Sequence, residues 1–330
     1  MTDLSRRFCL NALVAVAAMV TGTAALAQPA GNYPDKPIRL IVSSAAGGGA
    51  DTVARLMAKK IGEALKQPVV VENRPGASGV VAANAVLGAP ADGYTLLLGF
   101  TTMAQVPATT QIPLSYNPEK DFIPVSLIAK SWNVLFVNRK TNAKTIQELV
   151  AGMKANPRQY SYGSYGNGST GHFMGALFAQ QTKTEPSHVP YKGAAPMMTD
   201  LLAGVVSFAF PDIGSALPHI KSDRVQALAV TSSKRLTSLP DVPTMAELGI
   251  KGFDFGGWFG LFAPKGTPQA IVDVLSAQSM AAVKDREVQA KLVSMDLDPV
   301  GSNSKEFATF FHADMAKWAK IAKDANIKAE

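Results

Sequence analysis

Two glycine-rich segments contain the residue types that could do chemistry in this sequence. The first, Gly47-Gly48-Gly49, follows a strand-like run and precedes a helix-like run; the second spans residues 163–171 and has the same setting. Glycine lets the backbone turn tightly and leaves N–H groups unshielded, and the start of a helix adds a partial positive charge. The chemistry that these segments predict is binding of a carboxylate or phosphate, with a simple tight turn as the alternative.

The motifs of common enzymes and nucleotide sites are absent from both segments. Ala50-Asp51-Thr52 follows the first glycine run, so neither the lysine of a phosphate loop nor the G-x-G-x-x-G spacing is present. Gly163-Ser164-Tyr165-Gly166 lacks one residue of the G-x-S-x-G nucleophile motif. The histidines have no metal-ligand spacing: they are His172, His188, His219 and His312. We therefore expect a protein that is not an enzyme, with no catalytic residues, metal or cofactor.

Composition indicates a folded chain of two domains. It has 330 residues, of which 47% are hydrophobic, with 32 Lys+Arg against 25 Asp+Glu, and a domain usually takes about 150 residues. The basic residues form no run and are not interleaved with aromatics, so nucleic acid is not expected as a partner. A mild positive excess favours encounter with small anions.

The first 27 residues have the layout of a secretory signal peptide. Arg6 and Arg7 precede an apolar stretch over 10–26, and Ala25-Leu26-Ala27 is a cleavage pattern. A membrane anchor is the alternative, but the stretch is short of the ~20 residues that a span needs. We expect export to the periplasm with cleavage near Ala27, by a Sec or a Tat route. Cys9, the only cysteine, would be lost with the signal.

Strand-like and helix-like runs alternate along the rest of the chain. The first strands, 38–42, 69–71 and 94–98, are apolar throughout and separated by helices, which predicts a parallel sheet covered on both faces. An extended stretch over 125–137 is long enough to pass into a second domain. There the pattern restarts with helices 145–155, 172–181 and 195–202 and strands 160–162, 205–210 and 225–231, and 255–263 returns the chain to the first domain.

The final helix, 305–324, has an apolar stripe that predicts core packing: Phe307, Phe310, Phe311, Met315, Trp318 and Ile321.

With the two glycine-rich segments at the ends of strands in two α/β domains, we expect a crevice between them. Closure of two lobes around a ligand, with the crossing strands as the hinge, is the expected mechanism.

Nearly all of the chain after the signal resembles one family, the substrate receptors of tripartite tricarboxylate transporters, or Bug proteins. The matching motifs are Tyr33–Ile38, Ala46-Gly47-Gly48 with Asp51 and Arg55, Val71–Ala77, Ala91–Leu96, Gly163-Ser164 with Gly166, Gly168, Thr170 and His172, Val189–Gly193, Leu228–Thr231, Asp241–Thr244 and Trp258–Gly260. The resemblance implies a type II periplasmic binding protein fold: two doubly wound α/β lobes with a hinge formed by two crossing segments. Lobe 1 would comprise residues 33–138, lobe 2 residues 139–228, and residues 229–330 the return crossing and the rest of lobe 1.

The resemblance also implies the ligand-binding residues. In the first lobe they are Ser44, Gly47, Gly48, Asp51, Phe100, Thr101 and Thr102; in the second they are Ser164, Tyr165, Gly168, Thr170, His172, Gly193, Ala194 and Asp212. Backbone amides and hydroxyls are expected to hold a carboxylate, and Asp51 to orient its own loop. Asp212 has two interpretations, a pocket residue at a strand end or the cap of the following helical turn.

The first loop departs from the family pattern P-[FY]-x-A-G-G-S-T-D. Ser43, Ser44, Gly49 and Ala50 replace the proline, the aromatic residue, the serine and the threonine. Tyr165 stands where the family commonly has a small residue. The hypothesis is a reshaped pocket whose ligand is an aromatic acid or another anion stacked against Tyr165, in place of a C4–C6 dicarboxylate.

The resulting expectation is an extracytoplasmic receptor that captures a small organic carboxylate and delivers it to a tripartite tricarboxylate-type membrane transporter. The alternative is a periplasmic ligand sensor that docks to a two-component signalling kinase. The expected partners are therefore the small organic anion and either the membrane subunits of a transporter or the periplasmic domain of a sensor kinase. The receptor itself is expected to be a monomer.

Overall fold

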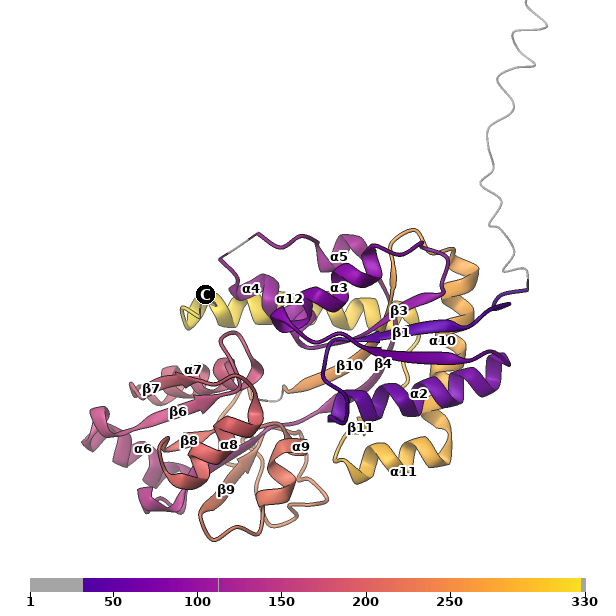
Figure 1. Cartoon of the computed structure of the whole chain (residues 1–330). Coiled ribbons are helices and arrows are strands. Elements are labelled where there is room, and N and C mark those ends of the chain that lie inside the picture. Colours follow the sequence, from indigo (N-terminus) through magenta and orange to yellow (C-terminus); the bar gives the residue numbers. More distant parts are fainter. Residues whose placement is uncertain (1–31, 112, 254, 328–330) are drawn as a thin grey trace, which may run out of the picture.

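The computed structural model describes residues 32–111, 113–253 and 255–327. The predicted signal peptide lies outside these residues. Two α/β lobes, each built around its own sheet, are joined by crossing segments (Figure 1). The fold is the two-lobed architecture that the resemblance implied.

Lobe 1 contains a six-stranded sheet with the order β11-β4-β10-β3-β1-β2. Its strands are β1 (Ile38–Val42), β2 (Val69–Asn73), β3 (Thr95–Phe100), β4 (Phe122–Ser131), β10 (Gly257–Pro264) and β11 (Asp298–Pro299). The parallel pairing predicted from the first three strands is confirmed for β1, β2 and β3. The rest of the sheet is antiparallel: β10 pairs antiparallel with both β3 and β4, and β11 pairs antiparallel with β4. β4 takes the chain out of the lobe and β10 brings it back, so these neighbours run in opposite directions.

Helices cover both faces of this sheet. They are α2 (Gly49–Leu65), α3 (Val80–Leu87), α4 (Thr102–Thr109), α5 (Pro118–Asp121), α10 (Gln269–Lys284), α11 (Arg286–Ser294) and α12 (Ser304–Asp324). The stripe predicted on α12 is confirmed as core: Phe307, Phe311 and Trp318 are fully buried. None of the helices in the described part of the chain is long and apolar enough to cross a membrane.

Lobe 2 contains a five-stranded sheet with the order β7-β6-β8-β5-β9. Its elements are β5 (Val134–Asn138), α6 (Ile146–Ala155), β6 (Ser161–Ser164), α7 (Thr170–Thr182), β7 (Ser187–Pro190), α8 (Ala194–Ala203), β8 (Phe208–Ala209), α9 (Ile213–Ala216) and β9 (Val225–Val230). The strand predicted over 205–210 is shorter, Phe208–Ala209, because α8 ends at Ala203 and the turn that closes it extends into the first predicted strand residues. Gly204 is left-handed, with φ 77°, and the Val205 N–H donates to the Asp200 carbonyl.

The two crossings lie nearer to the ends of the chain than the predicted lobe limits of 138 and 228. β4 ends at Ser131 in one sheet, and β5, which begins at Val134, pairs in the other. Residues 229–253 stay with lobe 2, because the Met245 N–H donates to the Val230 carbonyl and Leu236 and Leu239 pack in its core. The chain therefore crosses at residues 131–134 and returns at 255–257.

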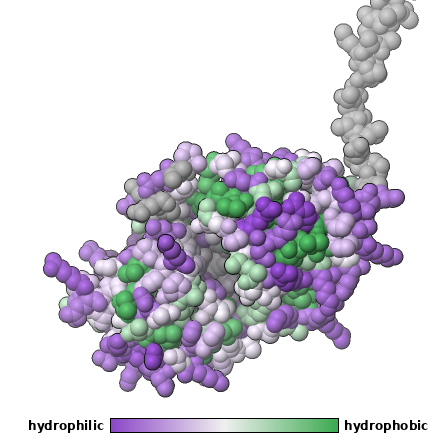
Figure 2. All heavy atoms as spheres, viewed as in Figure 1, coloured by the Kyte–Doolittle hydropathy of each residue, from purple (hydrophilic) through white to green (hydrophobic). Residues whose placement is uncertain are grey.

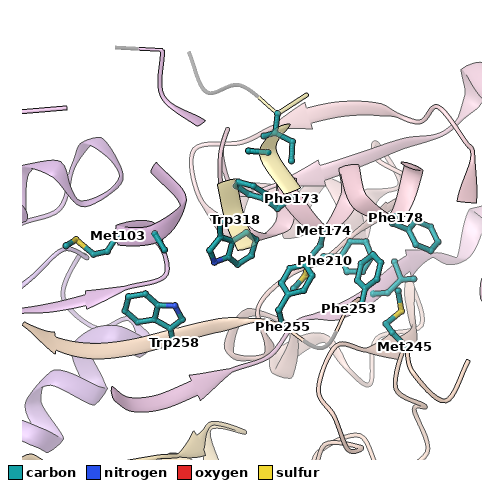
Figure 3. Packing of buried hydrophobic residues seen from close by; sticks show 14 of the residues in the cluster. Met103, Phe173, Met174, Phe178, Phe210, Met245, Phe253, Phe255, Trp258 and Trp318 are labelled. Atoms are coloured by element: carbon teal, nitrogen blue, oxygen red, sulfur yellow. The ribbon is translucent and has the colours of Figure 1, made fainter. Parts of the chain in front are cut away.

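A continuous aromatic cluster connects the lobes beside these crossings (Figure 3). Trp318 on α12 packs edge-on against Phe173 on α7, with ring centroids 4.7 Å apart, and against Phe255 of the return crossing at 5.0 Å. Edge-to-face pairs of this kind contribute about 0.5–1.5 kcal/mol each beyond burial of their surface. The lobes thus share a packed contact in addition to the covalent crossings.

Candidate functional site

The predicted ligand loops lie at strand ends that face the space between the lobes (Figure 1), and the surface is hollowed there (Figure 2). The two sides are brought together directly: Gln105 Nε2 on α4 donates to Thr170 Oγ1 at the start of α7, at 2.8 Å. Thr101 Oγ1 accepts from the backbone N–H of Trp258 on the return crossing, also at 2.8 Å. The loops of both lobes therefore surround the hinge.

Asp51 organises the loop between β1 and α2. Its buried carboxylate accepts from the N–H of Gly47 at 2.9 Å, from Arg55 Nε at 2.9 Å and from Asn73 Nδ2 at 3.0 Å. The Arg55 hydrogen bond, followed by that of Gly47, lowers the pKa of Asp51 to about 2. Asp51 therefore orients its own loop, and the glycines at 47 and 48 remain exposed.

Asp51→Asn should weaken both this loop and the fold. The ionised carboxylate contributes roughly 2 kcal/mol of stability, from a pKa about two units below the usual value. Because the folded-state pKa is lowered, that stability is present above the unfolded value of 3.8 and is lost as pH falls toward 2. Urea unfolding at pH 7 should show the loss, which should shrink when the two proteins are compared near pH 2. Equal stability at pH 7 would contradict this role.

Two further features of lobe 1 bear on the site. Ser44 Oγ is buried and has no hydrogen-bond partner among the described residues, although buried hydroxyls almost always have one. Gly79, at the start of α3, lies close to the loops that follow β1 and β3. A Cβ at this position would be 3.5 Å from both Ser43 Oγ and Thr102 Oγ1. Phe100 is half-buried at the end of β3, beside these groups. The β1, β2 and β3 loops thus form one continuous wall.

In lobe 2, some predicted residues face inward. Ser164 is fully buried, and its Oγ lies 2.7 Å from His188 Nε2 and 3.0 Å from the Gly166 carbonyl. His172 Nδ1 accepts from the Gly168 N–H at 3.1 Å, and its ring stacks on His188 with centroids 3.8 Å apart. Burial lowers the pKa of His172 to about 4. These side chains are engaged inside the lobe and support the glycine-rich loop from behind.

Tyr165 lies across the start of α7. A Cβ on Gly171 would come within 2.9 Å of its ring, so only glycine leaves room for the ring there. Its hydroxyl interacts with Thr170 and Asn133, and burial, followed by the charge of Asp212, raises the pKa of Tyr165 to about 12. The side chain is neutral at physiological pH and remains partly exposed. It can present a ring face at the wall of lobe 2.

The remaining predicted residues lie at the starts of α8 and α9. Gly193 has φ 112° and precedes α8, which begins at Ala194; the Tyr191 N–H donates to the Ser164 carbonyl and holds this turn beside the glycine-rich loop. Asp212 caps α9, accepting from the N–H of Ser215 at 3.0 Å and from its Oγ at 2.8 Å. Of its two interpretations, the structure therefore shows the cap.

Helix starts around the site differ in whether a side chain caps them: Ser169 caps α7 and Asp212 caps α9, but four other helices have no such cap. α2, α3, α4 and α8 begin here without a side-chain cap, whereas α6, α11 and α12 are capped by Thr145, Asp285 and Asn303. α10, which starts away from the site, also lacks a side-chain cap. Uncapped first turns leave backbone N–H groups available to a ligand, and their dipoles favour an anion.

Metal binding has no support in the described ranges. No cluster of three or more His, Cys, Asp or Glu side chains that could hold an ion occurs among residues 32–111, 113–253 and 255–327.

Sequence reasoning missed three residues that connect these parts: Asn73, Gln105 and Asn133. Asn73 bridges Asp51 and the Ser44 carbonyl, and Asn133 joins the outward crossing to Phe210 and Thr231. Gln105 is 1% exposed. The available signal was a polar residue inside an otherwise apolar run, as in Met103-Ala104-Gln105-Val106.

Comparison with known proteins identifies the family of this chain. Residues 53–327 match the model of the tripartite tricarboxylate transporter family receptor. The chain belongs to that family. Protein BugT of Bordetella pertussis is 34% identical over 322 residues, which cover 97% of this chain and 99% of BugT. Members are solute-binding receptors, and the chain is one of them.

Two solved relatives carry bound ligands. Rpa4515 of R. palustris, solved with adipate, is 34% identical with a TM-score of 0.82, over 90% of this chain and 100% of that one. MatC of Rhodopseudomonas palustris, solved with bound malate, is 30% identical with a TM-score of 0.75, over 88% of this chain and 99% of that one. The family and the two-lobed fold expected from the sequence are therefore confirmed.

Proposed function

We propose that this receptor captures a small organic carboxylate between its lobes in the periplasm and delivers it to the membrane subunits of a tripartite tricarboxylate-type transporter. The observation that carries the proposal is the group of uncapped helix starts, α2, α4 and α8, at facing loops of the two lobes. Each helix end favours an anion by about 0.3–1 kcal/mol, and by up to ~2 kcal/mol when partly buried. A carboxylate that contacts both lobes stabilises their closed arrangement, which the membrane subunits can recognise.

Within the first lobe, we assign the carboxylate contacts to the backbone of Gly47 and Gly48, the hydroxyl of Ser44 and the start of α4 at Thr101-Thr102. The unpartnered Ser44 Oγ supports this assignment, because a ligand oxygen would supply its missing partner. Asp51, Ser164 and His172 serve as supports, since the carboxylate of Asp51, the hydroxyl of Ser164 and the Nδ1 atom of His172 already have partners within the protein. In the second lobe the contacts are the turn at Gly193-Ala194 and the face of Tyr165.

The ligand class follows from Tyr165. Its ring is held over Gly171 and its hydroxyl is engaged with Thr170 and Asn133, so the group available to a ligand is an apolar ring face. A fixed ring face favours stacking of a second ring, worth about 0.5–1.5 kcal/mol. We propose an aromatic carboxylate in preference to the aliphatic acids bound to the two solved relatives.

Calorimetric titration of the purified receptor with benzoate, phenylacetate, adipate and malate tests the function and the ligand class together. We expect an aromatic acid to bind about two- to tenfold more tightly than either aliphatic acid, the factor that such stacking provides. Tyr165→Leu should remove this preference while leaving the weaker carboxylate binding. Tight adipate or malate binding without aromatic binding would overturn the ligand class, and absence of binding to any carboxylate would overturn the function.

Delivery is tested in cells. Uptake of the bound acid should stop when the receptor gene is deleted and return when it is restored. Uptake that continues unchanged would contradict a transport role.

A further inference from the structure

Gln105 occupies an unusual position in this receptor. It lies one turn into α4 of lobe 1, is 1% exposed, and its side chain donates to Thr170 of lobe 2, itself 5% exposed, at 2.8 Å. Its Nε2 is therefore occupied and sheltered, so Gln105 is not placed to touch a ligand. It is instead a buried polar contact that joins one lobe to the other.

Further polar groups connect the Gln105–Thr170 hydrogen bond to the outward crossing segment. Thr170 interacts with the hydroxyl of Tyr165, and that hydroxyl also interacts with Asn133. Asn133 lies on the outward crossing, where its backbone N–H donates to Thr231 Oγ1 at 3.0 Å and its Nδ2 donates to the Phe210 carbonyl at 2.9 Å. A chain of polar groups thus runs from α4 through the glycine-rich loop to the crossing segment.

We propose that Gln105 is a positioning residue: through Thr170 it holds the two lobes together and sets the fraction of the unliganded receptor that is ready to close. The physical basis is local. If the lobes separate, both partners must exchange a buried hydrogen bond for water, at a net cost that corresponds to about a two- to tenfold change in the equilibrium. Apparent ligand affinity scales with the fraction of binding-competent receptor, so the same factor should appear in ligand affinity.

The other direct contacts between the lobes differ from this buried bond. Gln180 Nε2 on α7 donates to the Asp324 carbonyl of α12 at an exposed site, and the Ser238 N–H donates to Asp296 Oδ1 over a longer distance of 3.4 Å. Trp318 against Phe173 is an apolar contact that does not depend on one direction, whereas a hydrogen bond weakens steeply as its angle and distance change. The aromatic contact can persist while the lobes rotate, and the Gln105–Thr170 bond cannot. Gln105 therefore distinguishes the arrangement seen here from more open ones.

The test measures the distance between the lobes in the unliganded receptor. Exposed Ala64 on α2 and Ala151 on α6 are replaced by cysteine and spin-labelled, which is straightforward because Cys9 is the only natural cysteine. Gln105→Met and Thr170→Val keep side-chain size but remove the bond. Each should lengthen and broaden the distance distribution in pulsed EPR, and the double variant should add little. Thr170→Ser, which keeps the hydroxyl, should retain the distribution of the parent.

Ser126→Ala provides a matched control, since Ser126 is fully buried and donates to the Ser302 carbonyl entirely within lobe 1. It should lower stability without altering the interlobe distance. An unchanged distribution in Gln105→Met would overturn the proposal, as would the same change in Ser126→Ala.

The affinity part rests on the proposed function: titration with benzoate and adipate should show a two- to tenfold loss in Gln105→Met. If the parent binds neither acid, the function fails while the EPR result still decides the role of Gln105.

Discussion

Replacing Gly256 by alanine is expected to destabilise the receptor by about 3 kcal/mol, at the upper end of what overpacking usually costs. A Cβ at this position would lie 2.0 Å from the carbonyl oxygen of Ser131 and 3.0 Å from its carbonyl carbon. Both contacts are backbone atoms of the outward crossing, so no side-chain rotation can relieve them. The two crossing segments would have to move apart, and the hinge geometry would change with them.

Urea unfolding measures the expected loss, and carboxylate titration shows whether the displaced hinge also weakens binding. Gly49→Ala is the matched control: its Cβ would meet nothing closer than the Met295 Cε at 3.8 Å, an ordinary contact, at the first residue of α2. It should be neutral or slightly stabilising, because alanine is favoured over glycine in helices. A Gly256→Ala protein as stable as Gly49→Ala would contradict the close approach of the crossings.

The buried histidine pair should make stability fall steeply in mild acid. Burial lowers the pKa of His172 from 6.5 to about 4, and burial together with neighbouring His172 lowers the pKa of His188 to about 3. The unfolded chain therefore takes up protons first, so stability is fully present above pH 6.5 and is lost as pH falls toward 4. For His172 alone the loss amounts to about 3 kcal/mol. Protonation of His172 Nδ1 would also turn the acceptor of the Gly168 N–H into a donor, so this hydrogen bond would be lost.

His172→Asn separates this effect from general acid denaturation. The asparagine Oδ1 can accept from the Gly168 N–H in place of Nδ1 but does not titrate in this range. Chemical unfolding at intervals between pH 7.5 and 4.5 should give a flatter profile for the variant, with the two proteins differing less in acid than at neutral pH. Parallel profiles would show that His172 does not control the pH dependence.

Much of the fold could be predicted from residue patterns. Apolar runs separated by helical segments placed β1, β2 and β3, and the α12 stripe identified its buried face. The direction of β10 and β4 could not be read this way, because the pattern of a buried strand is the same in either direction. The crossing points depended on which sheet Val134–Asn138 joins, a long-range pairing that local sequence does not specify.

The candidate site, too, could be predicted only in part from the sequence. Glycine runs at strand ends indicated the loops, and the spacing from Gly47 to Asp51 is that of a carboxylate that closes its own turn. The inward orientation of Ser164 and His172 could not be foreseen, because it depends on His188, which arrives from a neighbouring strand. Gln105 escaped notice for a similar reason: its partner lies 65 residues away in the other lobe.

All three tryptophans lie at or beside the crossings. Trp132 on the outward crossing donates its Nε1–H to Asp298, while Trp258 on the return crossing and Trp318 on α12 both donate theirs to the buried Asp314. Indole emission responds to nearby charge and hydration, so the protein has a built-in optical probe at its pivot. Its intrinsic fluorescence should follow lobe movement in real time, and unlabelled receptor can be screened against collections of acids without attaching a dye.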